Sequence, residues 1–142
     1  MKFGSEKQLA AYTKKNPNLR SLYIEGRLER VSALPATLTH LIFVDCPKLT
    51  TVSALPATLT HLYFYNCPVL TDVPVLPATL TRLLFEWCDA LTSVPDLPAK
   101  LTYLDFFWCR SLKMVRALPS TLTHLSSVDC PNLNVAALLA NR

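Results

Sequence analysis

Cysteine and histidine carry the most reactive side chains in this sequence, and both recur at a fixed interval. Cysteine occurs every 21 residues, at Cys46, Cys67, Cys88, Cys109 and Cys130. Histidine keeps the same phase, at His40, His61 and His124. Thiols and imidazoles in such an arrangement could form a nucleophilic dyad or a metal centre, and the thiols alone could form disulfides.

The cysteine spacing argues against each of these chemistries. Zinc ligands in small zinc motifs are separated by only a few residues, whereas these cysteines are 21 residues apart. His40 and Cys46 are six residues apart, roughly 20 Å along an extended segment, which is too far for a dyad. The cysteines are odd in number and the first residues lack the apolar stretch of a signal peptide, so we expect a reducing, cytoplasmic location. We interpret the cysteines as buried free thiols.

The three histidines share one position of the repeat, which Arg82 and Tyr103 occupy in the two intervening repeats. On adjacent strands His40 and His61 would lie within about 5 Å of each other, but His124 would be on the order of 14 Å from His61. A metal site needs more ligands than two imidazoles. We therefore expect these side chains to belong to a contact surface, with no bound metal or other cofactor.

Composition excludes further classes of protein. Gly4 and Gly26 are the two glycines, so the sequence contains neither a GxGxxG motif nor a P-loop. No apolar run reaches the roughly 18 residues that span a bilayer, so we expect no membrane insertion. The sequence does not bring together a serine, a histidine and an aspartate, or a pair of carboxylates, at any one position of the repeat. We therefore expect no enzyme.

An internal repeat of 21 residues determines the architecture. The unit reads LPATLTHLxFxxCxxLTxVxx, and its Leu-Pro pair recurs from Leu34-Pro35 to Leu118-Pro119. Leucine and phenylalanine alternate with variable residues, the period of a strand with one buried face. Stacked units would form a parallel sheet. The prolines between the strands favour polyproline-like or irregular crossings over helices.

A single domain of 142 residues accommodates these units. Residues 1–17 are predicted to form a helical N-terminal cap, because Ser5 is a good N-cap residue and Asn16-Pro17 ends the helix. Residues 18–33 read as a degenerate first repeat, and residues 34–133 as the regular repeats. Residues 134–142 are predicted to form a C-terminal cap with a short helix.

The core of the unit, LxxLxFxxCxxL, is the leucine-rich-repeat signature with cysteine in the position that asparagine or cysteine occupies. We therefore predict an α/β-type repeat solenoid, a leucine-rich-repeat horseshoe with a short parallel β-sheet on its concave face. The pairing of LPxxLxxLxF with a VPxLP crossing, over residues 34 to about 135, resembles the leucine-rich-repeat effectors that bacterial pathogens and intracellular parasites inject into host cells. The Cys-x-x-Leu variant is similar to the repeats of eukaryotic ligase adaptors.

This resemblance implies binding of a protein partner. Repeats of the effector family bind host or substrate proteins, and some members carry a separate ubiquitin-ligase domain. The chain is then expected to be an effector that a specialised system secretes into a host cell, where it acts on a host protein. The alternative is the substrate-recognition part of a larger ubiquitin-ligase-type effector.

The variable strand positions predict where a partner would bind. The middle repeats place aromatic side chains there, which are expected to form one contiguous patch: Tyr63, Tyr65, Trp87, Phe107 and Trp108. The neighbouring column completes the predicted protein-binding surface with His40, His61, Arg82, Tyr103 and His124. A polar rim is expected from Asp45, Asp105, Glu86, Asp129 and Arg82. Because this rim holds acids as well as bases, we expect no nucleic-acid binding. The chain is expected to be a monomer, or a weak homodimer if the aromatic patches of two copies pair with each other.

Overall fold

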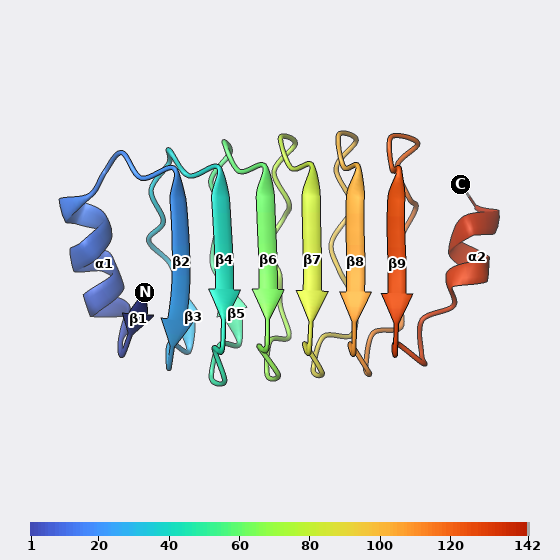
Figure 1. The fold of residues 1–142 in the computed structure, drawn as a ribbon, viewed down its shortest axis with the longest axis horizontal. Coiled ribbons are helices and arrows are strands. Elements are labelled where there is room, and N and C mark those ends of the chain that lie inside the picture. The colour runs from blue at the N-terminus through green and yellow to red at the C-terminus, as the bar shows by residue number, and fades with distance from the viewer. Residues whose placement is uncertain (142) are drawn as a thin grey trace.

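The computed structural model describes residues 1–141, which form one stack of parallel strands between two terminal helices (Figure 1). The helices are α1 (Glu6–Lys15) and α2 (Val135–Ala140). The main strands are β1 (Lys2–Phe3), β2 (Ser21–Gly26), β4 (His40–Val44), β6 (His61–Tyr65), β7 (Arg82–Glu86), β8 (Tyr103–Phe107) and β9 (His124–Val128). They form one seven-stranded sheet in the order β1-β2-β4-β6-β7-β8-β9. The predicted parallel-strand repeat solenoid is therefore confirmed.

The 21-residue period fixes the register of the sheet. Residues 21 positions apart pair across every junction from β4 to β9, so that Leu41 faces Leu62 and Phe43 faces Phe64. The phenylalanine rings therefore stack in a row, with centroids 4.9 Å apart at Phe43 and Phe64, 5.2 Å at Phe64 and Phe85, and 5.7 Å at Phe85 and Phe106. All four rings are fully buried. This row lies in the core, between the sheet and the segments that return behind it.

Threonine hydroxyls add a second set of bonds between repeats. The Thr79 hydroxyl donates to the carbonyl oxygens of Ala57 and Leu59 at 2.8 and 2.7 Å, and Thr58 and Thr121 make the equivalent bonds. The hydroxyl satisfies carbonyl groups that the turn before each strand leaves unpaired. The recurring Thr-Leu-Thr of the unit is thus part of the inter-repeat bonding.

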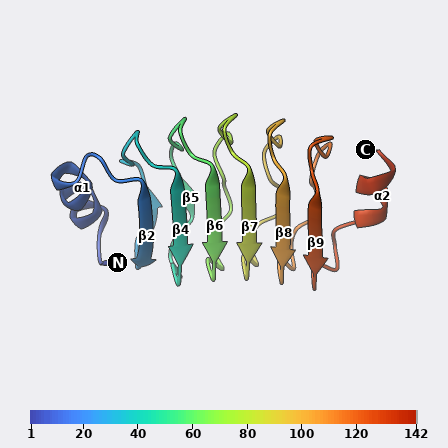
Figure 2. The ribbon, with the colours of Figure 1, turned by 45° about the horizontal axis from the view of Figure 1, so that its top comes forward.

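The segments behind the sheet form what we call the crossing side, and Figures 1 and 2 show them as loops behind the arrows. In residues 1–141 these segments contain no helix. Two short strands, β3 (Arg30–Val31) and β5 (Thr51–Val52), pair in parallel, and single bridges join Thr51 to Asp72 and Ser93 to Met114.

The pairing on the crossing side is interrupted in the middle of the stack. No bridge joins Asp72 to Ser93 in the part of the chain that the structure describes. The Ser53 amide donates to the Val31 carbonyl at 2.8 Å, but at the interrupted junction the matching donor position is Pro95, which has no N–H to donate. A shallow groove follows this break, between Asp72 and Val75 on one side and Ser93 and Met114 on the other.

The N-terminal end differs from the prediction that residues 1–17 form only a helical cap. Ser5 does cap α1, and its side chain accepts a hydrogen bond from the Gln8 amide. Ahead of the helix, however, β1 adds a strand to the sheet, and Phe3 is buried there beside Gly26. Gly26 has φ of 135°, and a Cβ atom would lie 2.1 Å from the Phe3 carbonyl oxygen. The close approach of β1 therefore requires glycine at this position.

The helices α1 and α2 lie at opposite ends of the stack of strands (Figure 1). Leu9 of α1 is fully buried, whereas α2 has no buried residue and its Val135 and Leu138 pack only partly against the core. In β9 the phenylalanine row ends at Ser127.

Neither helix in residues 1–141 combines the length and the apolar character needed to cross a bilayer.

Replacement of Phe64 should be strongly destabilising, because its ring stacks on Phe43 and on Phe85 in the middle of the row. We expect Phe64→Ala to lower the free energy of unfolding by about 3–5 kcal/mol, measured by urea denaturation. Val75→Ala is the control, since Val75 is 86% exposed, and it should change the free energy by less than about 0.5 kcal/mol. Equal effects of the two substitutions would contradict the assignment of the row to the core.

Candidate functional site

The side of the sheet that points away from the core carries the candidate site, and we call it the outer face. Along each strand from β4 to β9, the first, third and fifth residues lie on this face, and the second and fourth point to the core. One further residue follows each strand before its cysteine. The outer face is thus made of four columns of side chains, three on the strands and one in the turn.

Four of the five predicted aromatic residues form one cluster on the outer face, which we call the aromatic cluster: Tyr65, Trp87, Phe107 and Trp108. Tyr65 contacts Trp87 edge to face at 5.0 Å, and Trp87 stacks on Trp108 at 5.1 Å between ring centroids. Phe107 lies 6.4 Å from Trp108. The expectation of one patch that includes Tyr63 needs correction, because the ring contact of Tyr63 is with His61, at 6.2 Å. Tyr63 projects from the middle of its strand, whereas the cluster gathers where the strands end.

The turn column has a backbone conformation that sequence reasoning missed. Its five residues all have positive φ, between 48° and 54°: Asp45, Asn66, Trp87, Trp108 and Asp129. Asparagine and aspartate are the side chains that tolerate this left-handed region best after glycine, and bulky residues are rare in it. The sequence signal that could have predicted this conformation is the aspartate or asparagine that three of the five repeats place at this position. The two tryptophans are therefore exceptions to the conformational preference of their own column.

The polar rim is less exposed than the sequence predicts. Asp105 lies on the outer face but is buried, because His124 of the next strand covers it and donates from Nε2 to its Oδ1 at 2.8 Å. The expectation that Asp105 is a rim residue is wrong for this reason. Glu86 lies between Tyr65 and Phe107 in the pairing register, and burial raises the pKa of its carboxyl.

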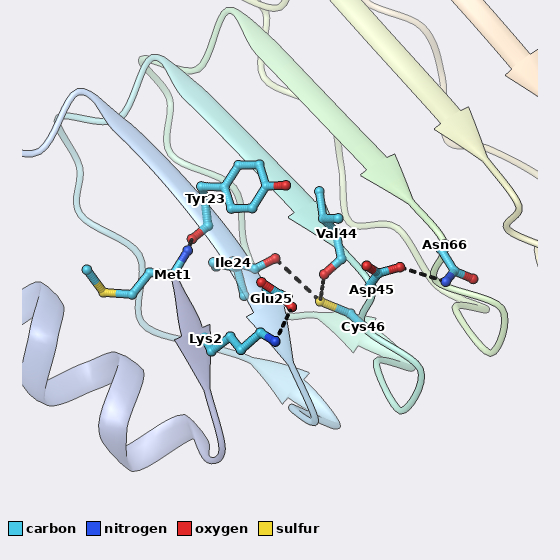
Figure 3. A network of polar contacts seen from close by, with 9 residues as sticks. All are labelled: Met1, Lys2, Tyr23, Ile24, Glu25, Val44, Asp45, Cys46 and Asn66. Carbon is cyan, nitrogen blue, oxygen red and sulfur yellow. Dashed lines mark hydrogen bonds and ion pairs between the residues drawn. The ribbon is translucent and has the colours of Figure 1, made fainter.

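Acidic groups at the N-terminal end of the outer face are held in a network that Figure 3 shows. The Lys2 ammonium lies 2.9 Å from Glu25, and the Asn66 side-chain amide donates to Asp45 at 2.7 Å. The terminal amine of Met1 donates to the Tyr23 carbonyl at 3.0 Å. Asp45 and Glu25 are thereby oriented along the edge where the strands end.

The histidine column is a row of stacked rings at the opposite edge of the outer face. His40 stacks on His61 with centroids 4.1 Å apart, and Tyr103 stacks on His124 at the same distance. The Arg82 guanidinium lies 5.3 Å from the centre of the Tyr103 ring. The five residues of this column are thus brought side by side, and the structure keeps them apart from the aromatic cluster at the other edge.

The cysteines are free and buried in a row behind the turn column. The Cys46 thiol donates to the carbonyl oxygens of Ile24, one repeat earlier, and Val44, at 3.6 and 3.5 Å (Figure 3). Neighbouring thiols also interact. At Cys109, contact with Cys130 lowers the pKa while contact with Cys88 and burial raise it, and the net pKa is about 12. The pKa values of Cys67, Cys88 and Cys130 are also raised, whereas the contact with the Cys67 thiol lowers the pKa of Cys46. In residues 1–141 no three histidine, cysteine or acidic side chains form a group that could hold a metal ion.

The four thiols with raised pKa values should make stability fall at alkaline pH. Well below pH 9 they are protonated in both the folded and the unfolded state, because the ordinary pKa of a cysteine is 9.0. Between pH 9 and 12 the unfolded chain releases protons that the folded chain keeps, so the free energy of unfolding decreases as the pH rises. Urea denaturation at pH 8 and pH 10 under reducing conditions measures this decrease. Cys109→Ala should show a smaller decrease than the unchanged protein, and an identical decrease would contradict the role of this thiol.

Comparison with solved structures agrees with the repeat geometry. The crystal structure of CroV588, described as a circular LRR protein, is similar to 78% of this chain at 30% sequence identity and a TM-score of 0.60. This chain spans 17% of the length of CroV588. No protein-family model matches the sequence, and no curated protein matches it. With its 21-residue period, parallel sheet and cysteine-containing turns, the chain folds as a leucine-rich-repeat solenoid.

Proposed function

We propose that this chain is a non-catalytic module that binds a partner protein through the aromatic cluster of the outer face. The observation that carries the proposal is the left-handed backbone of Trp87 and Trp108. A residue with a β-carbon in this region costs roughly 1–2 kcal/mol. Such strain is typical of functional positions.

The fold itself does not require tryptophan at these two positions. Asp45, Asn66 and Asp129 occupy the same column in other repeats and make the same turn. The tryptophan rings lie outside the core, although their stacking at 5.1 Å recovers part of the backbone cost. We infer that the remaining advantage of tryptophan is intermolecular, because tryptophan and tyrosine dominate binding hot spots.

The chemistry of the neighbouring groups supports a protein as the partner. Glu86 lies beside Tyr65 and Phe107, and Asp129 follows Trp108 in the turn column. An apolar centre with acidic groups around it has the composition of a protein interface. Nucleic acid would instead require cationic groups beside stacking rings. Four of the five buried thiols support the absence of catalysis, since their raised pKa values make them poor nucleophiles.

Finer aspects of the function are proposed from the sequence resemblance. It supports a host protein as the partner of a secreted effector, and as the alternative a substrate-recruiting role in a larger ubiquitin ligase. Five free thiols support a reducing compartment, either the cytoplasm of the producing cell or that of a host. The chain is proposed to act as a monomer or a weak homodimer.

The test replaces both tryptophans by the residue that stands at their position in another repeat. Trp87→Asn/Trp108→Asn should leave the free energy of unfolding within about 1 kcal/mol of the original, because relief of backbone strain offsets the lost ring stacking. Binding to a partner first isolated with the unchanged protein and then purified should weaken by at least about 30-fold, measured by calorimetry.

The matched control is Val75→Asn, which introduces asparagine at an exposed position of the crossing side. It should leave the affinity unchanged. If the double tryptophan variant folds and binds as tightly as the unchanged protein, the aromatic cluster is not the binding surface.

A further inference from the structure

We propose that His40 and His61, with Arg82 beside them, form a proton-coupled binding site for an oxyanion such as a sulfate, phosphate or carboxylate group. The site lies at the edge of the outer face where the strands begin, away from the aromatic cluster. It therefore goes beyond the proposed protein-binding function and stands on different residues.

The hydrogen bonds of two threonines fix the orientation of the imidazole rings. The Thr39 hydroxyl lies 3.0 Å from the Arg20 carbonyl oxygen and 2.9 Å from His40 Nδ1. The Thr60 hydroxyl lies 2.9 Å from the Thr39 carbonyl oxygen and 2.9 Å from His61 Nδ1. A hydroxyl has one proton, and a carbonyl oxygen can only accept. The hydroxyl proton therefore goes to the carbonyl, and Nδ1–H of each histidine donates to the hydroxyl oxygen.

Other repeats support this assignment of the hydroxyl proton. Thr81 and Thr102 stand at the same position and donate to the carbonyl oxygens of Thr60 and Thr81 at 3.1 and 3.2 Å. Their following residues, Arg82 and Tyr103, offer no imidazole. The bond to the carbonyl thus forms whether or not a histidine follows. His40 and His61 consequently keep Nε2 as the ring nitrogen without an intramolecular partner in residues 1–141.

The geometry of the pair suits an oxyanion and not a metal ion. The two rings are nearly parallel, with an angle of 19° between their planes and 4.1 Å between their centroids. A metal ion binds in the plane of each imidazole at about 2.0–2.1 Å from nitrogen, and two nearly parallel planes do not meet at that distance. When protonated, however, the two Nε2–H groups point in similar directions from adjacent rings. The oxygens of one oxyanion can accept from both.

The charges around the pair make binding depend on protons. Burial lowers the pKa of His61 first, and the charges of His40 on β4 and Arg82 on β7 lower it further. On its own strand, His61 also contacts the Tyr63 ring, and on β2 the residue opposite His40 is the uncharged Ser21. Within residues 1–141, no carboxylate forms an ion pair with any of these three cationic groups. A bound anion supplies the missing negative charge, so the pair should take up protons as the anion binds.

His124 provides an internal comparison. It occupies the same column, but its Nε2 is 2.8 Å from Asp105 Oδ1 and its ring stacks on Tyr103. An intramolecular carboxylate thus already fills the place that we assign to the external anion at His40 and His61. An added anion should therefore not affect His124 in the same way.

The experiment is an NMR titration of the three imidazoles between pH 5 and 8, with sodium sulfate compared with sodium chloride at equal ionic strength. Sulfate keeps its charge across this range, so any proton uptake belongs to the protein. We expect saturating sulfate to raise the pKa of His40 and of His61 by about one pH unit, which corresponds to about tenfold tighter binding to the protonated form. His124 should change far less. No rise at His40 and His61, or an equal rise at all three, would overturn the proposal.

Variants separate the site from general charge screening. His61→Phe keeps a stacked ring and removes both nitrogens, and it should abolish the effect of sulfate on His40. Arg82→Gln should weaken sulfate binding severalfold, whereas His124→Asn should leave it unchanged. Equal binding by His61→Phe and the unchanged protein would also overturn the proposal.

A second arm distinguishes the source of the anion. Binding of a phosphoserine peptide is compared with binding of inorganic phosphate under the same conditions. Tighter binding of the peptide assigns the anion to a phosphorylated polypeptide, and equal or tighter binding of inorganic phosphate assigns it to a small free anion. Both results support an oxyanion site. If neither the peptide nor inorganic phosphate binds, the proposal is contradicted. Because Trp87 and Trp108 take no part, loss of the proposed protein partner in their variant leaves this result unaffected.

Discussion

The constant register between neighbouring strands is the constraint on which the rest of the molecule depends. From β4 to β9 each strand pairs with the next at an offset of one repeat, so each side chain meets its counterpart in the neighbouring repeat. In the core this produces the row of phenylalanine rings and, behind the turns, the row of thiols. On the outer face the same register produces the histidine column and the pair of stacked tryptophans. Core and site are therefore consequences of one alignment of the backbone.

The turn after each strand shows how a packing rule and a functional residue can conflict. The left-handed residue turns the chain so that the following cysteine faces the core, and its own side chain is left outside. The fold therefore restricts the backbone at this position but leaves the side chain outside free to vary. Aspartate and asparagine tolerate the left-handed backbone well. Trp87 and Trp108 tolerate it poorly and increase the backbone strain, but they offer large rings for an intermolecular contact. A column of this kind is where a repeat protein can change its binding properties without changing its core.

The repeat could be predicted from the sequence because its signal is periodic. Leucines and phenylalanines at fixed intervals decide which face of each strand is buried, and no tertiary detail alters that. Features that depend on one contact could not be predicted in this way. The burial of Asp105 depends on His124 reaching across to it, and the pairing of Lys2 and Phe3 with β2 depends on Gly26 allowing a close approach. The separation of Tyr63 from the aromatic cluster likewise follows from its position along the strand.

The interruption on the crossing side has a mechanical consequence. Bridges on the crossing side join Thr51 to Asp72 and Ser93 to Met114, but in residues 1–141 none joins Asp72 to Ser93. The sheet, the core, the Thr79 hydroxyl and the bond from the Ala90 amide to the Pro68 carbonyl connect the two halves at this junction. A stack of repeats bends most easily where the fewest bonds join neighbouring repeats. The missing bridge and the lack of an N–H at Pro95 weaken this junction, so the solenoid should flex there as two stiffer halves. The junction lies behind β6 and β7, whose outer face carries Tyr65 and Trp87, so flexing would change the spacing of the aromatic cluster.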